Sequence, residues 1–290
     1  MAAPARKTAL VTAGSAGLGA AIARVLALEL GMSVTINYHS NADRAKALVQ
    51  ELQDAWAARQ TTDTAQAPPP VFHAIRADIC KRSEIIRLVE ETTAASGGRL
   101  DAVVSNVGWT RMRDFSDLED GVDEDDWDRC FGANVKAHLW LFHAAKKWLE
   151  EANAREEGSA VFVSTASIAG CKPSGSSLVC KGEDRIPKPY LRILIVTKSE
   201  LQPYAVTKAA QIHLIKSLAV IAAPSIRVNC VSPGVLLTVC STSSKPILGN
   251  RLTSPPGRTG DFLFLPHGSK LSRRQTSCIG LPQSRMWQSK

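Results

Sequence analysis

Short apolar runs alternate with longer segments of helical periodicity along most of this chain, and this alternation constrains the fold more than any other feature. The short runs are rich in Val, Ile and Thr, as buried strands are, and they cover residues 8–13, 33–39, 71–78, 100–108, 159–165 and 225–233. The longer segments repeat apolar residues every three or four positions, as amphipathic helices do, and they cover residues 18–30, 41–60, 83–95, 126–152 and 205–223. Strands that are apolar on both faces and joined by helices form parallel sheets. We therefore predict an α/β fold with one doubly wound parallel sheet in a single domain.

Composition and charge exclude several classes of protein. The hydrophobic fraction of 44% is enough to bury a core, so the chain is not intrinsically disordered. No 18 consecutive apolar residues occur, and the first residues lack the apolar stretch of a signal peptide, so we expect no membrane partner. The net charge of +8 is concentrated in residues 241–290, which contribute +7, and in residues 179–202, which contribute +2. The rest of the chain is close to neutral, which argues against a nucleic-acid partner.

The cysteines indicate a reducing environment. Seven are present, and they form no CxxC pair and no regular spacing. This usage is typical of reduced thiols rather than of disulfides or a zinc site. We therefore expect a cytoplasmic protein without a metal.

A glycine-rich turn follows the first predicted strand and opens the first predicted helix. Its sequence is Thr12-Ala13-Gly14-Ser15-Ala16-Gly17-Leu18-Gly19. Glycines at this point let the backbone approach a pyrophosphate, whose negative charge is favoured by the helix N-terminus. The turn predicts a Rossmann-type dinucleotide site, in which we expect the cofactor to be contacted by Thr12, Gly14, Ser15, Gly17, Leu18 and Gly19.

The end of the second predicted strand bears on the choice between NAD(H) and NADP(H). It reads Asn37-Tyr38-His39-Ser40, and no acid follows before Asp43. An NAD enzyme usually places an acid here to hold the ribose 2′-hydroxyl, whereas polar donors and the cations His39 and Arg44 suit a 2′-phosphate. We expect NADP(H) to be favoured over NAD(H), with Asn37, Tyr38, His39 and Ser40 at its adenosine end. Alternatively, Arg44 is an ordinary solvated helix residue.

Tyr204 and Lys208 form a YxxxK pair between the last two predicted strands. On a helix, residues four apart share a face. A lysine beside a phenol favours the phenolate form, which suits a tyrosine to general acid–base work.

These motifs, in this order, resemble those of the classical short-chain dehydrogenase/reductase family over residues 6–178 and 203–238, and its 3-oxoacyl-(acyl-carrier-protein) reductase-like branch in particular. The glycine turn resembles the family's TGxxxGxG, with Ala13 in place of the first glycine. Gly14 follows, and we expect the change to be tolerated if the turn relaxes by one residue. Three later motifs resemble the family's adenine-contacting pair, its NNAG strand end and its PGxxxT motif, and they imply cofactor contacts from Asp78, Ile79, Asn106, Gly108, Pro233, Gly234, Val235 and Thr238.

The resemblance also implies a catalytic set. Tyr204 would exchange a proton with the substrate oxygen, and Ser167 would hydrogen-bond that oxygen. Lys208 would also hold the nicotinamide ribose, and Tyr204 would contact the cofactor as well. Asn134 would complete the tetrad through a water. The implied reaction is hydride transfer between the nicotinamide and a small-molecule ketone or secondary alcohol, in a family whose members are usually homo-oligomers.

One segment departs from the family pattern between the serine and the tyrosine. These residues stand 37 positions apart, where the family has about a dozen, and removing residues 179–202 reduces the separation to 13. Codons for Val179 can begin with GT and the codon for Gln202 can end with AG, and 24 codons preserve the reading frame. Our hypothesis is a retained intron, and the alternative is a genuine insertion.

A second departure begins after Thr238, where strand patterning stops. Residues 277–290 can be back-translated so that another frame reads as a helix of the family type, which suggests a second intron with a frameshift. We predict a reductase domain at residues 1–238, interrupted by 179–202, with the C-terminal strand and helices missing or replaced. Residues 239–290 would be an irregular, basic, disordered tail. The alternative function is a catalytically impaired homologue that only binds dinucleotide.

Overall fold

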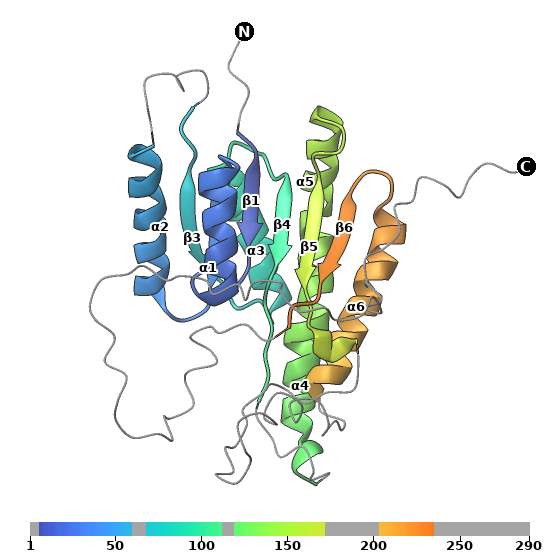
Figure 1. The fold of residues 1–290 in the computed structure, drawn as a ribbon. Helices are drawn as coiled ribbons and strands as arrows, with labels where there is room; N and C mark the ends of the chain where they lie inside the picture. The colour runs from blue at the N-terminus through green and yellow to red at the C-terminus, as the bar shows by residue number, and fades with distance from the viewer. Residues whose placement is uncertain (1–5, 60–67, 112–118, 172–202, 235–290) are drawn as a thin grey trace, which may run out of the picture.

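The computed structural model describes residues 6–59, 68–111, 119–171 and 203–234, and in these ranges the chain forms a three-layer α/β domain (Figure 1). All strand pairings of the described sheet are parallel. Its order is β3-β2-β1-β4-β5-β6, with the strands at Thr8–Val11 (β1), Ser33–Tyr38 (β2), Phe72–Arg76 (β3), Ala102–Ser105 (β4), Val161–Thr165 (β5) and Arg227–Val231 (β6). The predicted Rossmann-type, doubly wound parallel sheet is confirmed.

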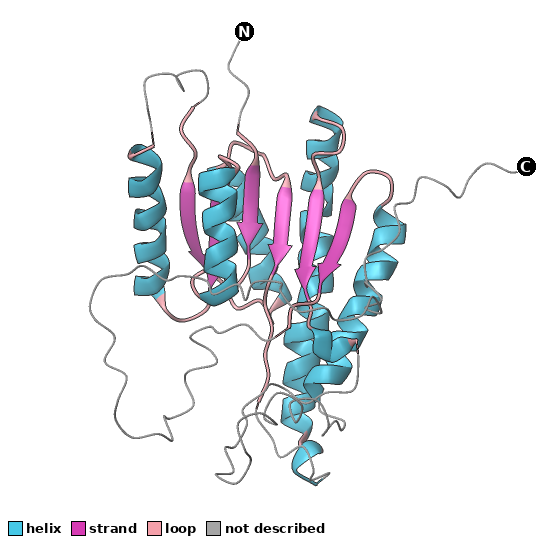
Figure 2. Cartoon of the chain, viewed as in Figure 1, coloured by secondary structure: helices cyan, strands magenta, loops and turns pink. Residues whose placement is uncertain are grey.

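Helices cover both faces of the sheet (Figure 2). The main ones are Gly17–Arg24 (α1), Ala42–Ala57 (α2), Arg82–Ala95 (α3), Glu124–Phe131 (α4), Ala137–Arg155 (α5) and Pro203–Ala222 (α6). Alternate residues of one strand point to opposite faces. Leu10 of β1 therefore joins the core cluster with α3, α5 and α6, whereas Ala9 and Val11 join the cluster with α1 and α2.

Two predicted helices are interrupted by π-helical turns. The first is followed by η1, Val25–Glu29, and the long predicted helix 126–152 is divided into α4 and α5 by η3, Gly132–Lys136. Short 3-10 turns, η2 at Glu119–Gly121 and η4 at Ile168–Gly170, complete the described elements. A π-helical turn inserts one residue into the helical ladder and often marks a functional site.

The strand order reverses between β1 and β4, because β2 and β3 extend the sheet on one side of β1 and the later strands on the other. In open α/β sheets ligands bind at the carboxyl ends of the strands at such a switch point. Here the Thr12 amide donates to the Val104 carbonyl at 3.0 Å, and the Asn106 amide donates to the Thr12 hydroxyl at 2.9 Å. The switch point is thus held together by the first residues after β1 and β4.

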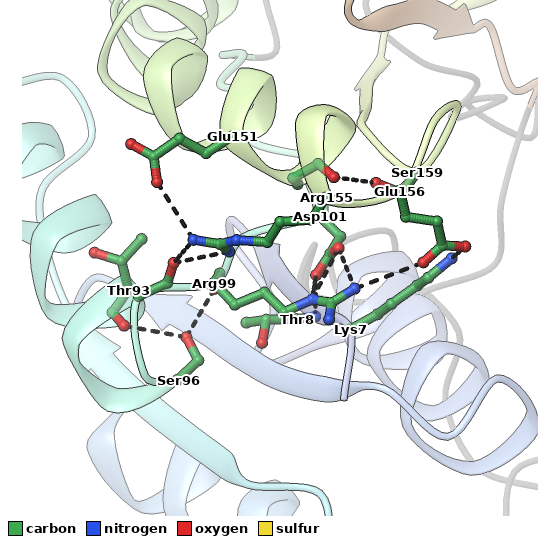
Figure 3. A network of polar contacts seen from close by, with 12 residues as sticks. Lys7, Thr8, Thr93, Ser96, Arg99, Asp101, Glu151, Arg155, Glu156 and Ser159 are labelled. Carbon is green, nitrogen blue, oxygen red and sulfur yellow. Dashed lines mark hydrogen bonds and ion pairs between the residues drawn. The ribbon is translucent and has the colours of Figure 1, made fainter. Parts of the chain in front are cut away.

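A polar network closes the opposite, amino end of the strands (Figure 3). Asp101, which is 1% exposed, accepts from the Thr8 amide at 2.8 Å and from Nε of Arg99 at 2.8 Å. Glu156, after α5, pairs with Lys7 at 2.7 Å and with Arg99 at 3.8 Å. These contacts join β1, β4 and α5 and stabilise the amino end of the sheet. A ligand site is therefore expected at the opposite, carboxyl end of the strands.

By length and composition, α6 is the one helix among the described residues that would pass for a membrane span. It packs against the sheet, however, and contributes Ile215, Leu218 and Ala222 to the core cluster. Its apolar composition is explained by that packing. Within the described ranges β6 lies at an edge of the sheet, where Val231 is exposed.

Candidate active site

The glycine turn is packed tightly against the ends of β1, β2 and β4. The Gly14 amide donates to the Asn37 carbonyl at 2.9 Å. A β-carbon on Gly14 would lie 2.8 Å from Cβ of Ile36, and one on Gly19 would lie 2.3 Å from the Ala13 carbonyl oxygen. Both distances are too short for any side chain. Glycine is therefore required at both positions for the turn to pack closely, and the turn lies at the start of α1, where backbone amides fit the pyrophosphate of a dinucleotide.

The structure shows how the turn accommodates Ala13 at the position of the family's first glycine. Ala13 itself takes the left-handed conformation, with φ of +49°, and its side chain is exposed. Its amide donates to Oδ1 of Asn37 at 3.3 Å. Ala13 therefore bears the free-energy cost of a Cβ in the left-handed conformation.

Asn37 has a different role from the predicted cofactor contact. Its side chain is buried, and Nδ2 donates to the carbonyls of Ala77 at 3.0 Å, Tyr38 at 3.3 Å and Ile75 at 3.4 Å. Because these carbonyls and the Ala13 amide use its polar atoms, the amide has no donor left for a phosphate. Asn37 instead joins the glycine turn to the end of β3.

The other residues at the end of β2 face solvent to different degrees. Tyr38 is half-buried and packs on the α1–α2 face, whereas His39, Ser40 and Arg44 are exposed. Sequence reasoning missed Arg76, the residue of β3 that pairs with Tyr38. Its Nε donates to the His39 carbonyl at 3.2 Å, so Arg76 adds a basic side chain to the end of β2. The signal that would have identified Arg76 is the register between β2 and β3.

Asp78 and Ile79 form the turn between β3 and α3. Oδ1 of Asp78 accepts from the Cys80 amide at 3.0 Å, and the Asp78 amide donates to Glu84 at 2.7 Å. The hydrogen bond from this amide lowers the pKa of Glu84. Ile79 is buried in the core cluster with α3 and α5. Both residues thus shape the loop, and their contact with adenine stays a prediction.

Gly108 lies between two of the predicted catalytic residues. A β-carbon there would be 3.3 Å from Oδ1 of Asn134 and 3.3 Å from Nζ of Lys208. Upstream, Nδ2 of Asn106 would be 2.8 Å from a β-carbon on Gly19, so Asn106 adjoins the glycine turn. The segment after β4 therefore runs from the glycine turn to the Lys208 ammonium.

Asn134 is placed by the π-helical turn η3 and is fully buried. Its Oδ1 accepts from the Trp109 amide at 2.8 Å, and its Nδ2 donates to the Trp109 carbonyl at 3.0 Å and to the Thr207 hydroxyl at 3.0 Å. Asn134 thereby ties the loop after β4 to α6. Its predicted action through a water is compatible with the remaining acceptor capacity of Oδ1.

Lys208 is the centre of the site. It is 3% exposed, and Nζ donates to the Thr165 carbonyl at 3.1 Å and to Oε1 of Gln211 at 2.8 Å. The same Nζ lies 5.6 Å from the centroid of the Tyr204 ring. Burial lowers the pKa of Lys208 to about 8, against an opposing effect of the thiols Cys230 and Cys130. No carboxylate lies within ion-pair distance of Nζ in the described part of the chain.

Ser167 caps the 3-10 turn η4 at the end of β5, and its Oγ accepts from the Ala169 amide at 3.2 Å. This turn is packed on α6, since a β-carbon on Gly170 would lie 2.5 Å from the carbonyl carbon of Lys208. The Ile168 amide donates to the Pro233 carbonyl at 3.0 Å. The strand ends of β5 and β6 and the start of α6 therefore meet at Ser167.

The structure thus gathers the predicted catalytic residues on adjoining elements at the carboxyl edge of the sheet: Asn134 on η3, Ser167 before η4, and Tyr204 and Lys208 on α6. Pro233 and Gly234 follow β6 at the same edge. The predicted contacts Val235 and Thr238, the proposed insertion 179–202 and the tail 239–290 lie outside the described residues.

Comparison with known proteins bears on the family and the fold of this chain. The family model described as short chain dehydrogenase matches residues 7–179, and a second, described as Enoyl-(Acyl carrier protein) reductase, matches residues 191–252. The residues between the two matches, 180–190, lie inside the proposed insertion. A putative ketoacyl reductase 2 of the granaticin polyketide synthase from Streptomyces violaceoruber is 31% identical over 89% of this chain and 86% of its own.

Solved structures show the same fold with nicotinamide dinucleotides bound. A short chain dehydrogenase from Burkholderia cenocepacia J2315, in complex with NADP, has a TM-score of 0.60 and 30% identity over 82% of this chain and 78% of its own. A 7 alpha-hydroxysteroid dehydrogenase with NADH and 7-oxo glycochenodeoxycholic acid has a TM-score of 0.60 and 25% identity over 82% and 74%. The predicted oxidoreductase class is confirmed, and this chain belongs to the short-chain dehydrogenase/reductase family.

Proposed function

We propose that this protein interconverts a ketone and a secondary alcohol with NADP(H), and that Tyr204 exchanges the proton with the substrate oxygen. The observation that carries the proposal is the buried Lys208 ammonium, which lies beside the Tyr204 ring at the carboxyl edge of the sheet. A cation with no carboxylate partner among the described residues favours a nearby anion, so it supports the phenolate form of Tyr204.

The residues around this pair have separate roles in the proposed reaction. Ser167 donates its hydroxyl hydrogen to the substrate oxygen and Tyr204 gives or takes the proton there, while Lys208 stabilises the phenolate. Asn134 holds Trp109 and Thr207 in place, which keeps the loop after β4 against α6. When bound, the nicotinamide ring supplies or accepts the hydride.

The glycine turn supports the dinucleotide part of the proposal, because it packs closely at the start of α1, where a pyrophosphate is favoured. The residues that would hold the cofactor there are Thr12, Gly14, Ser15, Gly17, Leu18 and Gly19, with Asn106 and Gly108 from the neighbouring strand end. NADP(H) is proposed over NAD(H) because the exposed basic residues His39, Arg44 and Arg76 lie at or near the end of β2, and no acid stands between Asn37 and Asp43. Such cations suit a 2′-phosphate.

The reaction is tested by following NADPH absorbance with a panel of ketones that includes a 3-oxoacyl thioester. We expect Tyr204→Phe to lose on the order of 100- to 10,000-fold in turnover, while NADPH binding measured by fluorescence is retained. Ser167→Ala should also lose turnover, whereas Ser217→Ala, the same change at an exposed serine of α6, should not. NADPH binding without turnover in the unchanged protein would overturn the proposal and support the catalytically impaired homologue.

Cofactor preference has its own test, because nucleotide binding is measurable without turnover. We expect a lower Kd for NADPH than for NADH. Removing a charge-assisted contact costs about 1.5–3 kcal/mol, so Arg44→Ala and Arg76→Ala should each raise the Kd for NADPH by about 10- to 100-fold. NADH binding should change little. Lys46→Ala, which removes an exposed charge from the same helix as Arg44, serves as the control. A preference for NADH would contradict this proposal.

We also propose a cytoplasmic location. The support is that Cys80, Cys130 and Cys230, in the part of the chain that the structure describes, are free thiols, as is usual in a reducing compartment. Fractionation of the source cells with antibody detection checks it, and recovery from a secreted or membrane fraction would contradict it.

A further inference from the structure

A chain of buried polar side chains extends from the Lys208 ammonium into the protein, away from the proposed substrate. Oε1 of Gln211 accepts from Nζ at 2.8 Å, and Nε2 of Gln211 donates to the Ser164 hydroxyl at 2.6 Å and to the Thr165 carbonyl at 3.1 Å. The Ser164 hydroxyl lies 3.1 Å from Nδ1 of His138. The Ser105 hydroxyl lies 2.6 Å from the same nitrogen.

The members of this chain come from four elements, namely α6, β5, α5 and β4. All of them have an exposed fraction of 0%, and core residues of the α3–α5–α6 face surround them. Burying a polar group costs free energy unless it is hydrogen-bonded. Packing alone would be served better by apolar side chains at Gln211 and His138, so their presence needs another explanation.

The donors and acceptors fit together in one direction. An ammonium can only donate, so the oxygen of the Gln211 amide must face Nζ and its nitrogen must face Ser164. The Ser164 hydroxyl, which accepts from the amide nitrogen, then has its hydrogen free to donate toward Nδ1 of His138. A neutral imidazole with its lone pair at Nδ1 accepts that hydrogen. Burial, reinforced by the charge of Lys208 and opposed by the Val107 backbone, lowers the pKa of His138 to about 3, so the ring is neutral at working pH.

We propose that Gln211 is a positioning residue for the reaction: it holds the Lys208 ammonium toward Tyr204, and Ser164, His138 and Ser105 hold its amide in the required orientation. This rests on the function proposed above for Lys208. It adds to that function because the two hydrogen bonds from Nζ, to Gln211 and to the Thr165 carbonyl, fix where the cation stands. Neither the sequence motifs nor the family comparisons point to Gln211 or His138.

The test compares two substitutions of similar size at Gln211. Gln211→Met removes the acceptor, which makes the ammonium less favourable and should lower the pKa of Lys208 by about one unit or more. Gln211→Glu places a negative charge beside Nζ and should raise it by a similar amount. Ser164→Ala removes the acceptor that orients the Gln211 amide, so it should also lower the pKa of Lys208, but by less than Gln211→Met does.

The pKa of Lys208 is read by NMR of protein labelled with ¹³C at the lysine ε-carbon, with the resonance assigned by its absence in Lys208→Met. The other titratable groups that face Nζ are Tyr204 from α6, Cys130 from α4, Cys230 from β6 and His138 from α5. These groups are unchanged in both Gln211 variants. Opposite shifts of the Lys208 pKa in the two variants therefore report the side chain substituted at position 211. Gln50→Met, an exposed glutamine on α2, should shift nothing.

In the active protein the alkaline limb of the turnover profile should move with the pKa of Lys208, to lower pH in Gln211→Met and to higher pH in Gln211→Glu. A residue with only a packing role would lower stability in both variants without opposite shifts. Equal or absent shifts, or a Gln211→Glu variant that folds with an unchanged Lys208 resonance, would overturn the proposal. The NMR measurement does not depend on turnover. An inactive protein would refute the proposed function, whereas the Lys208 pKa shifts would still test the role of Gln211.

Discussion

Replacing Ala13 by glycine isolates the energetic consequence of a single backbone angle. Ala13 has φ of +49° in the turn that precedes α1, and its side chain is exposed, so the substitution removes no buried contact. Its amide keeps the hydrogen bond to Asn37, because that bond belongs to the backbone. The substitution therefore changes the strain of the folded turn and the entropy of the unfolded chain, and little else.

The two terms have opposite signs. A Cβ in the left-handed region costs roughly 1–2 kcal/mol, which glycine avoids. Glycine also makes the unfolded chain more flexible, which costs about 0.4–1 kcal/mol. We expect Ala13→Gly to raise the free energy of unfolding by about 0.5–1 kcal/mol. Urea denaturation followed by circular dichroism measures this as a higher midpoint with an unchanged slope.

The matched control is Ala47→Gly, the same substitution at an exposed position inside α2. There the backbone is helical and glycine should lower the free energy of unfolding by about 1 kcal/mol. The two variants should thus shift the midpoint in opposite directions. If Ala13→Gly is destabilised as much as Ala47→Gly, the turn is not strained at Ala13 and the reasoning is refuted.

Three further predictions follow from the site and its supports. Gly170→Ala should separate η4 from α6 and abolish turnover, because its β-carbon would lie 2.5 Å from the Lys208 backbone, whereas Gly132→Ala, with no atom within 4 Å, should retain activity; comparing the two by assay and thermal melt checks this. Since the folded-state pKa of Lys208, about 8, lies below its ordinary value of 10.5, the unfolded chain binds more protons between these pH values. The free energy of unfolding should therefore rise with pH across this window, by up to about 3 kcal/mol relative to Lys208→Met; denaturation at several pH values measures the difference, and parallel curves would contradict it. Asp101→Asn should destabilise the fold by about 3 kcal/mol, because Arg99 loses its buried partner; a melt unchanged within error would show that the network at the amino end of the sheet is dispensable.

The fold could be predicted from the sequence because its signals are local. A buried parallel strand is a short apolar run, and a helix repeats its apolar residues every three or four positions, so the alternation of the two determined the doubly wound sheet. In the same way, the order of the motifs along the chain predicted which residues form the candidate site. Once Tyr204 and Lys208 are placed on the helix before β6, the sheet topology brings them to the edge where β5 ends with Ser167.

Side-chain direction and the choice of partners were decided by the tertiary structure. Asn37 is turned inward by the carbonyls of β3, and Arg76 meets His39 only through the register of β2 with β3. The close packing of Gly14 against Ile36 joins the glycine turn to β2, and no local pattern encodes that contact. Gln211 and His138, 73 positions apart, meet around Ser164 because α5 and α6 pack on the same face of the sheet as the core-facing residues of β5. Periodicity specifies which face of an element is buried, whereas the hydrogen-bond partner of a buried polar group depends on residues distant in sequence that only packing brings together.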